Sequence, residues 1–138
     1  MDATTRRILV INGKGGCGKT TIATNLAVAY ASAGYSVALV DNDPQASSTY
    51  WTEIRSDELP PVQLVAAHQR THMYQTHTFQ HRLPASAERV IVDGHSNARD
   101  RDLEALLKQA DVVLVPLLPS AIDIRAGGQF ITTLLRKK

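Results

Sequence analysis

The chain has 138 residues, of which 43% are apolar and 20% are charged, and its 15 basic and 13 acidic side chains give a formal net charge of +2. This length suits one globular domain with one core, because domains typically hold about 100 to 200 residues, and it disfavours a two-domain enzyme. A charge this close to zero is no sign of a nucleic-acid partner, since neutralising phosphates requires a concentrated basic face. We therefore predict a single domain over residues 1–138.

Cysteine content and hydropathy indicate the compartment. Cys17 is the single cysteine, so an internal disulfide is excluded, in agreement with a reducing environment. The longest apolar run, residues 112–118, falls far short of the roughly 20 residues that cross a bilayer. The short apolar run after Arg6 and Arg7 is too brief for the core of a signal peptide. We expect a cytoplasmic protein without a membrane partner.

Short apolar, β-branched runs alternate with helical patterns along the chain. The runs cover residues 8–11, 37–40, 62–65, 90–92 and 112–115. None of them alternates polar with apolar side chains, and strands that are apolar on both faces belong to parallel sheets covered on both sides. The pattern predicts an α/β fold with a mostly parallel central sheet and helices on both faces.

Three helices are predicted around these strands. Apolar residues recur at helical spacing over residues 22–31, and Gly34 follows where a left-handed residue would end the helix. Amphipathic patterns also cover residues 103–110 and about 124–135. The first strand, first helix and second strand form a βαβ unit. Residues 52–87 are the least regular part of the chain.

A glycine-rich segment lies between the first predicted strand and the first predicted helix. It reads Gly13-Lys14-Gly15-Gly16-Cys17-Gly18-Lys19-Thr20-Thr21. This segment contains G-x-x-x-x-G-K-[ST], in which glycines let backbone N–H groups turn toward an anion and the helix adds the positive end of its dipole. Lys19 can then reach the β and γ phosphates, and the Thr20 hydroxyl can complete the oxygen shell of Mg²⁺. A plain glycine turn would not explain the Lys-Thr pair, so we predict a nucleotide-binding P-loop.

Three aspartates follow predicted strands. Asp41 and Asp43 come at the end of the second strand, and Asp93 ends the fourth. Because ligands bind at the carboxyl ends of the strands in open α/β sheets, we expect the three carboxylates to share one edge with the P-loop. An aspartate in such a position is often only a turn former or a helix cap. Three of them beside a complete P-loop favour nucleotide chemistry.

The segment from Lys14 to Thr21 resembles the deviant Walker A ATPases of the ParA/MinD family, in which an extra lysine precedes the glycine pair. Residues 41–45, Asp-Asn-Asp-Pro-Gln, are similar to that family's second motif, and residues 112–123 resemble the strand and loop of ParA-type partition proteins. The resemblance covers nearly the whole chain and is closest to small plasmid ParA proteins that have no N-terminal DNA-binding domain. It implies a P-loop NTPase fold that uses ATP and Mg²⁺.

The resemblance also implies roles for individual residues. Lys14 would be the signature lysine, which reaches the partner's phosphates across a nucleotide-sandwiched dimer, while Lys19 and Thr20 would keep their P-loop roles. Because phosphoryl transfer depends on positioning and charge neutralisation, a lysine delivered by the partner makes hydrolysis depend on dimerisation.

The aspartates have implied roles as well. Asp43 would orient or activate the attacking water. Asp41 would lie in the magnesium shell or its surroundings, and Asp93 would hold the ion, through water. The implied function is a switch in DNA segregation or cargo positioning, in which ATP favours the dimer and a centromere-binding, ParB-like partner stimulates hydrolysis. Nonspecific DNA is a further candidate partner.

The sequence departs from the family pattern at two places. Gly94-His95-Ser96-Asn97 follows Asp93, where many relatives carry a proline-containing turn. Relatives also continue well beyond the position of Lys138, adding strands, much of the adenine pocket and most of the basic residues credited with DNA binding. We therefore expect a C-terminally short relative without the last strands of the full fold. In such a domain residues 112–118 lie at or near a sheet edge, which we expect self-association to cover.

Four histidines form two pairs at i, i+4 spacing, namely His68 with His72 and His77 with His81. This spacing places both imidazoles of a pair on one helix face, where they could bind a transition metal. No acidic or cysteine ligand accompanies them in the sequence, so a solvated helix is the favoured interpretation. Cys17 in the P-loop is likewise interpreted as a small space-filling residue.

Other function classes were weighed against the ATPase switch. A truncated, catalytically weak nucleotide-binding or oligomerising module stays open. An iron–sulfur reductase is disfavoured because Cys17 lies inside the P-loop, and an amidating synthetase would need a substrate domain that 138 residues cannot house. Membrane targeting of the MinD type is disfavoured because no separate basic amphipathic tail follows the last helix. Base specificity stays open, since a P-loop reads phosphates.

Overall fold

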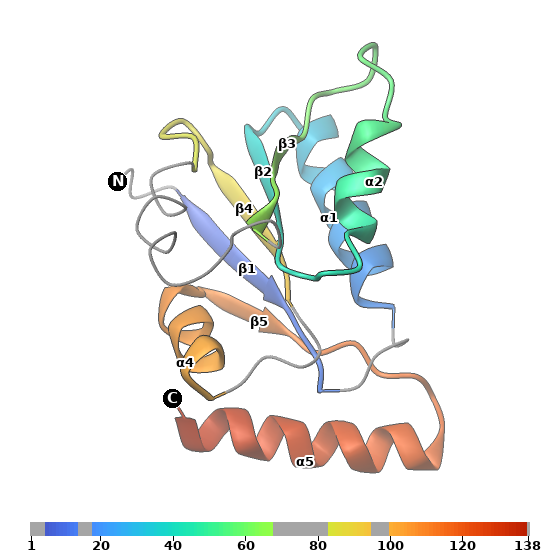
Figure 1. The fold of residues 1–138 in the computed structure, drawn as a ribbon, viewed down its shortest axis with the longest axis vertical. Helices are drawn as coiled ribbons and strands as arrows, with labels where there is room; N and C mark the ends of the chain where they lie inside the picture. The colour runs from blue at the N-terminus through green and yellow to red at the C-terminus, as the bar shows by residue number, and fades with distance from the viewer. Residues whose placement is uncertain (1–4, 14–17, 68–82, 95–99, 138) are drawn as a thin grey trace.

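The computed structural model describes residues 5–13, 18–67, 83–94 and 100–137. One five-stranded sheet runs through the domain in the order β3-β2-β4-β1-β5 (Figure 1). Every strand pair in it is parallel. The elements in chain order are β1 (Arg6–Val10), α1 (Lys19–Ser32), β2 (Val37–Asp41), α2 (Ser47–Glu53), β3 (Gln63–Val65), β4 (Arg89–Asp93), α4 (Asp100–Gln109), β5 (Val112–Leu114) and α5 (Ala121–Lys137).

The predicted α/β class, the five strands and the three helices are confirmed, with element ends shifted by a few residues. Helix α2 was not predicted. Its sequence SSTYWTE has only seven residues and no apolar periodicity, so nothing in the local pattern marks it as a helix. Within the described residues no helix is both long and apolar enough to cross a membrane.

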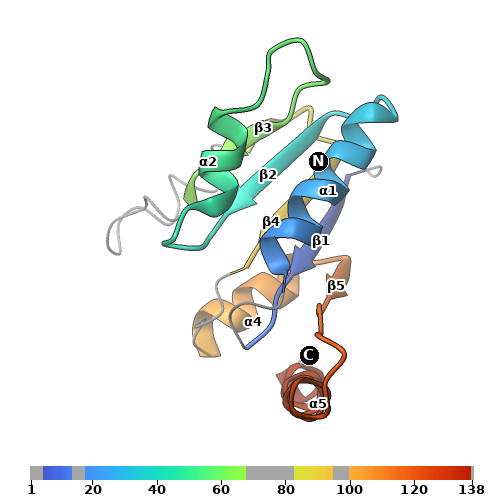
Figure 2. The same ribbon diagram turned by 90° about the vertical axis from the view of Figure 1, so that its right-hand side faces the viewer.

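The sheet is covered on both faces, which explains why its strands read as continuous apolar runs. Ile8 and Val10 of β1 pack on the face where α1 and α2 lie (Figure 2), with Ala23 and Ala27 of α1 in the same cluster. Leu9, between them, packs on the opposite face. The residues buried with Leu9 on that face come from the segment directly after β1, from α4 and from α5: Ile11, Leu103, Leu107 and Leu134.

Gly34 ends α1 as predicted. Its φ of +97° is a left-handed conformation, which favours glycine. The amide of Gly34 donates to Ala31 O at 3.1 Å, and the amide of Tyr35 donates to Tyr30 O at 3.1 Å. This pair of bonds is a Schellman motif. It ends the helix within one turn and directs the chain into β2.

Strand β5 lies at one edge of the sheet, where we expected it, and pairs with β1. Large apolar side chains are exposed beside it, in the loop before α5 and along α5. Together with Val112 of β5, these exposed residues are grouped under the name β5–α5 apolar surface: Leu117, Leu118, Ile122, Ile124, Ile131 and Leu135.

Helix α5 packs closely against the loop that follows β5 and against the start of the P-loop. A Cβ added at Gly127 would overlap Cδ2 of Leu117, so the absence of a side chain lets Leu117 lie on the helix. One turn along, the ring of Phe130 lies against Gly13, where a Cβ would be 3.0 Å from Cδ1 of the ring. The position of α5 is thereby linked to the predicted P-loop.

The adjacent glycines of α5 allow a matched test of this packing. Gly128→Ala should stabilise the domain by about 0.5–1 kcal/mol, because alanine is the better helix former and the added Cβ meets nothing within 4 Å. Gly127→Ala gains the same helix propensity but displaces Leu117, and overpacking costs about 1–3 kcal/mol. We expect its urea midpoint to fall below that of Gly128→Ala and of the wild type. Equal stabilisation by both substitutions would show that Leu117 does not hold α5.

Candidate functional site

The predicted P-loop starts just after the carboxyl end of β1 and runs into the first turn of α1. The structure describes both of these ends. Gly18 has a φ of +91° and precedes Lys19, the first residue of α1. A side chain at Gly18 would be strained whatever the space around it, so this glycine is required by the backbone. Lys14, Gly15, Gly16 and Cys17 lie outside the described residues, and their predicted roles stay predictions.

The first turn of α1 brings two predicted functional residues to the sheet edge. Lys19 is only 6% exposed. The hydroxyl of Thr20 donates to Oδ2 of Asp93 at 2.8 Å. This bond crosses from α1 to β4, and the sheet order explains it, because β4 lies next to β1 with Val10 opposite Asp93. The structure therefore joins the P-loop to the aspartate that was predicted to hold a metal.

Asp93 is completely buried at the end of β4. Its Oδ2 accepts from Thr20 and also from the hydroxyl of Ser48, at 2.6 Å. Its Oδ1 is buried and has no hydrogen-bond partner in the described part of the chain. Burial raises the pKa of this carboxyl above its usual value, the bonds from Ser48 and Thr20 oppose the rise, and the charges of Asp41 and Asp43 add to it. The ionised carboxylate therefore lacks one favourable contact, which a cation could supply.

Asp41 is also completely buried, but its carboxylate is surrounded by donors. Its Oδ1 accepts from the amide of Asp43 at 3.0 Å. Its Oδ2 accepts from both the amide and the hydroxyl of Thr49, each at 2.8 Å. Asp41 thus shapes the turn after β2 and caps the first turn of α2. This is the turn-forming and helix-capping role that an aspartate after a strand often has.

Asp43 lies in the turn between β2 and α2 and is half-buried. One of its carboxylate oxygens, Oδ1, accepts from the amide of Gln45 at 2.9 Å, and its carbonyl accepts from the amide of Ala46 at 2.9 Å. Its charge is close enough to contribute to the raised pKa of Asp93. The structure therefore brings Asp43 to the same sheet edge as Thr20 and Asp93, as predicted.

Three polar residues of this edge were missed in the sequence. Ser48 and Thr49 belong to α2, which has no helical pattern, and only their hydroxyls shortly after Asp-Asn-Asp-Pro-Gln could have drawn attention to them. Asn12, directly before Gly13, is buried and donates from Nδ2 to Pro116 O at 2.7 Å. That bond ties the start of the P-loop to the segment after β5.

The carboxylates do not form a metal cage by themselves. Among the described residues no group of three or more His, Cys, Asp or Glu side chains could hold an ion. A Mg²⁺ ion usually keeps several waters and is bound by one or two protein oxygens plus substrate phosphates. The arrangement at Thr20 and Asp93 suits that second kind of site. The histidine pairs, residues 68–81, lie outside the described part of the chain.

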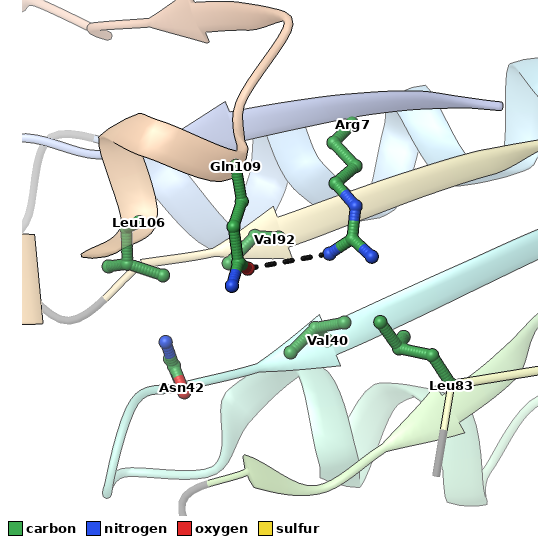
Figure 3. A pocket seen from close by; sticks show the side chains of 7 residues that line it. All are labelled: Arg7, Val40, Asn42, Leu83, Val92, Leu106 and Gln109. Carbon is green, nitrogen blue, oxygen red and sulfur yellow. Dashed lines mark hydrogen bonds between the residues drawn. The ribbon is translucent and has the colours of Figure 1, made fainter. Parts of the chain in front are cut away.

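A separate pocket of about 150 Å³ lies on the face of the sheet that α4 covers (Figure 3). Val40 and Val92 line it together with Leu106 of α4, and Nη1 of Arg7 donates to Oε1 of Gln109 at 3.5 Å within it. Asn42 lines the pocket too, but Asp41, Asp43 and Asp93 do not. The candidate nucleotide site is therefore distinct from this pocket.

Comparison with known proteins identifies relatives of the chain. The chain is 32% identical over 136 residues to the maintenance of carboxysome distribution protein A of Halothiobacillus neapolitanus, covering 90% of this chain and 56% of that protein. It is 34% identical over 123 residues to the protein ParA of Rhizobium radiobacter, covering 88% and 53%. The chain thus spans about half the length of the curated relatives it matches.

Solved structures share the fold. A plasmid partition protein of Borrelia burgdorferi bound to AMPPNP matches with a TM-score of 0.73 and 18% identity, over 96% of this chain and 70% of that one. Cobyrinic acid a,c-diamide synthase of Mycobacterium smegmatis with bound ADP and magnesium matches with a TM-score of 0.69 and 24% identity, over 96% and 67%. Residues 8–138 match the model of the CobQ/CobB/MinD/ParA nucleotide binding domain. With its P-loop and parallel sheet, the chain belongs to this family of nucleotide-binding domains, as its resemblance to ParA and MinD predicted.

Proposed function

We propose that the chain binds ATP with Mg²⁺ at the P-loop edge and hydrolyses it as a partition-type ATPase. In this function it acts as a nucleotide-dependent dimerisation or assembly switch in DNA segregation or cargo positioning. The observation that carries the proposal is the bond from Thr20 to Asp93. It joins the end of the P-loop motif to a buried carboxylate whose other oxygen has no partner in the described residues.

Mg²⁺ fits the donors at this edge. Thr20 and Asp93 would hold it, with Asp41 in the surroundings, where its hydrogen bonds to Asp43 and Thr49 keep the loop in shape. A magnesium ion bound with nucleotide neutralises charge on the phosphates. The hard oxygen donors of a hydroxyl and a carboxylate are those that Mg²⁺ prefers.

The catalytic residues that we propose are Lys14, Lys19 and Asp43. Lys19 binds the phosphates from the first turn of α1. Asp43 orients the attacking water, and its place in the turn after β2, near Asp93, supports this role. Lys14 reaches the nucleotide of a second copy, so that hydrolysis depends on dimerisation. Gly13 and residues 15–18, with Thr21, complete the cradle of backbone N–H groups.

The relatives suggest the partners. Proteins named for plasmid or chromosome partition and for carboxysome distribution are among them, so the cargo is either DNA or a large assembly. We propose that the chain associates with itself and with a centromere-binding, ParB-like protein, and that nonspecific DNA is a further candidate partner. The exposed residues of the β5–α5 apolar surface support self-association, because burying apolar side chains against a second copy is favourable.

A second candidate is a nucleotide-binding or oligomerising module with weak catalysis. The observation that favours it is the exposure of the β5–α5 apolar surface. Both functions require nucleotide binding at the P-loop, and they differ in turnover.

Phosphate release and light scattering separate the two functions. The switch predicts Mg²⁺-dependent ATP hydrolysis that rises when DNA and a partition partner are added, and a larger scattering mass with ATP than without it. A chain that binds ATP but releases no phosphate under any of these conditions would be the weak module. A well-behaved monomer with and without ATP would contradict self-association in either function.

A further inference from the structure

Two adjacent hydroxyls of α2 reach two different strands of the sheet. Thr49 donates to Asp41 at the end of β2, and Ser48 donates to Asp93 at the end of β4. Ser48 is completely buried, whereas its neighbour Ser47 is exposed. Strands β2 and β4 are themselves neighbours with Asp41 opposite Asp93, so α2 lies over both carboxylates at once.

The bond from Ser48 determines which oxygen of Asp93 is engaged within the protein. Ser48 at 2.6 Å and Thr20 at 2.8 Å both donate to Oδ2. Oδ1 receives no hydrogen bond from the described residues, although it is buried. A carboxylate held from two sides through one oxygen has little freedom to rotate, and the other oxygen keeps one orientation.

We propose that Ser48 is a positioning residue for the metal site: its hydroxyl fixes Asp93 through Oδ2 so that Oδ1 is presented to Mg²⁺. The inference rests on the proposed function, since it assumes that Mg²⁺ binds with nucleotide at this edge. Outer partners that orient a metal-binding carboxylate commonly contribute about 10- to 100-fold to metal affinity. Without the Ser48 hydroxyl, only the hydrogen bond from Thr20 would restrain the Asp93 carboxylate.

A merely structural role for Ser48 makes a different prediction. Helix α2 has a second anchor in the bonds from Thr49 to Asp41, and the hydroxyl of Thr52 binds the carbonyl of Ser48 and not its side chain, at 2.9 Å. Removing the Ser48 hydroxyl should therefore leave α2 in place. A change in metal affinity without a change in folding or in metal-free nucleotide binding separates positioning from support.

The test is a Mg²⁺ titration of mant-ADP binding by the full chain, with wild type, Ser48→Ala and the matched control Ser47→Ala. We expect the Mg²⁺ concentration for half-maximal binding to rise about tenfold in Ser48→Ala and to stay unchanged in Ser47→Ala. Binding of mant-ADP in EDTA should be equal for all three. Ser48→Cys, which fills the site with a slightly larger side chain and a weaker donor, is the second variant if Ser48→Ala folds poorly, and its Mg²⁺ midpoint should change in the same direction.

The outcomes separate the inference from the function on which it rests. If Ser48→Ala and Ser48→Cys fold and their Mg²⁺ midpoints equal that of the wild type, the positioning role is overturned and the proposed function is unaffected. An equal loss of mant-ADP binding with and without Mg²⁺ in Ser48→Ala also overturns it, because the hydroxyl then supports the fold of the site. Failure of the wild type to bind mant-ADP, or to respond to Mg²⁺, overturns the proposed function and the inference together.

Discussion

Lys19→Ala should lose nucleotide binding, whereas Lys14→Ala should keep it and lose hydrolysis. Lys19 begins α1 and is almost fully buried, and alanine in its place removes the ammonium that we propose binds the phosphates. Hydrogen bonds to charged groups contribute about 1.5–3 kcal/mol each, and losing two of them weakens binding by at least about 100-fold. Lys14 acts on the partner's nucleotide in our proposal. A charge delivered in this way is worth about 10³-fold or more in turnover.

The measurements are mant-ATP affinity and phosphate release, with Lys108→Ala as control because Lys108 is an exposed lysine in the last turn of α4. We expect the control to match the wild type in both. Catalysis would be excluded if the wild type and both P-loop variants bound ATP with similar affinity and none of them released phosphate. If both variants lost ATP binding equally, Lys14 and Lys19 would not have separate roles, but the proposal that the P-loop binds nucleotide would remain.

Asp93→Asn should abolish the response to Mg²⁺ while changing the stability of the nucleotide-free domain by no more than about 1 kcal/mol. The amide oxygen can still accept from Thr20 and Ser48, and the substitution removes a charge whose burial is unfavourable, as the raised pKa of Asp93 indicates. The substitution also removes the negative charge and the second oxygen with which Asp93 would hold the metal and its water. We therefore expect Mg²⁺-dependent ATP turnover to fall by about 100-fold or more.

Thermal unfolding with and without MgADP measures this effect directly. A ligand at 100 times its Kd stabilises the folded state by about 2.7 kcal/mol, and we expect this gain in the wild type but not in Asp93→Asn. Asp102→Asn, an exposed position in α4, is the matched control and should behave as the wild type. Stabilisation of Asp93→Asn by MgADP equal to that of the wild type would refute the assignment of Asp93 to the metal.

Much of the site could be predicted because its signals are local. Gly18 precedes Lys19 and Thr20 within one turn of backbone, and the left-handed conformation of Gly18 is the kind that glycine favours. The same holds for Gly34, whose position after an apolar helical pattern predicted the end of α1. The parts that could not be predicted depend on contacts between distant residues. Ser48 and Asp93 are 45 residues apart in the chain, and nothing in the short sequence of α2 indicates that they meet.

Asp41 shows how a local signal can leave two roles open. Its position after a strand predicted either metal chemistry or a turn and a cap, and both fit the same residues in the sequence. The three hydrogen bonds from Asp43 and Thr49 give it the second role. Its predicted place in the magnesium surroundings stays a prediction.

The sequence by itself determined the α/β class, the five strands and the P-loop segment, because runs of apolar residues and the spacing of glycines are local patterns within short stretches of the chain. Only the tertiary structure decided the strand order, which inserts β4 between β2 and β1. That order places Asp93 beside both Thr20 and Ser48, and it places β5 with its apolar neighbours at an edge. The physical reason is that pairing between parallel strands is set by the packing of helices across the whole sheet, which no short stretch of sequence contains.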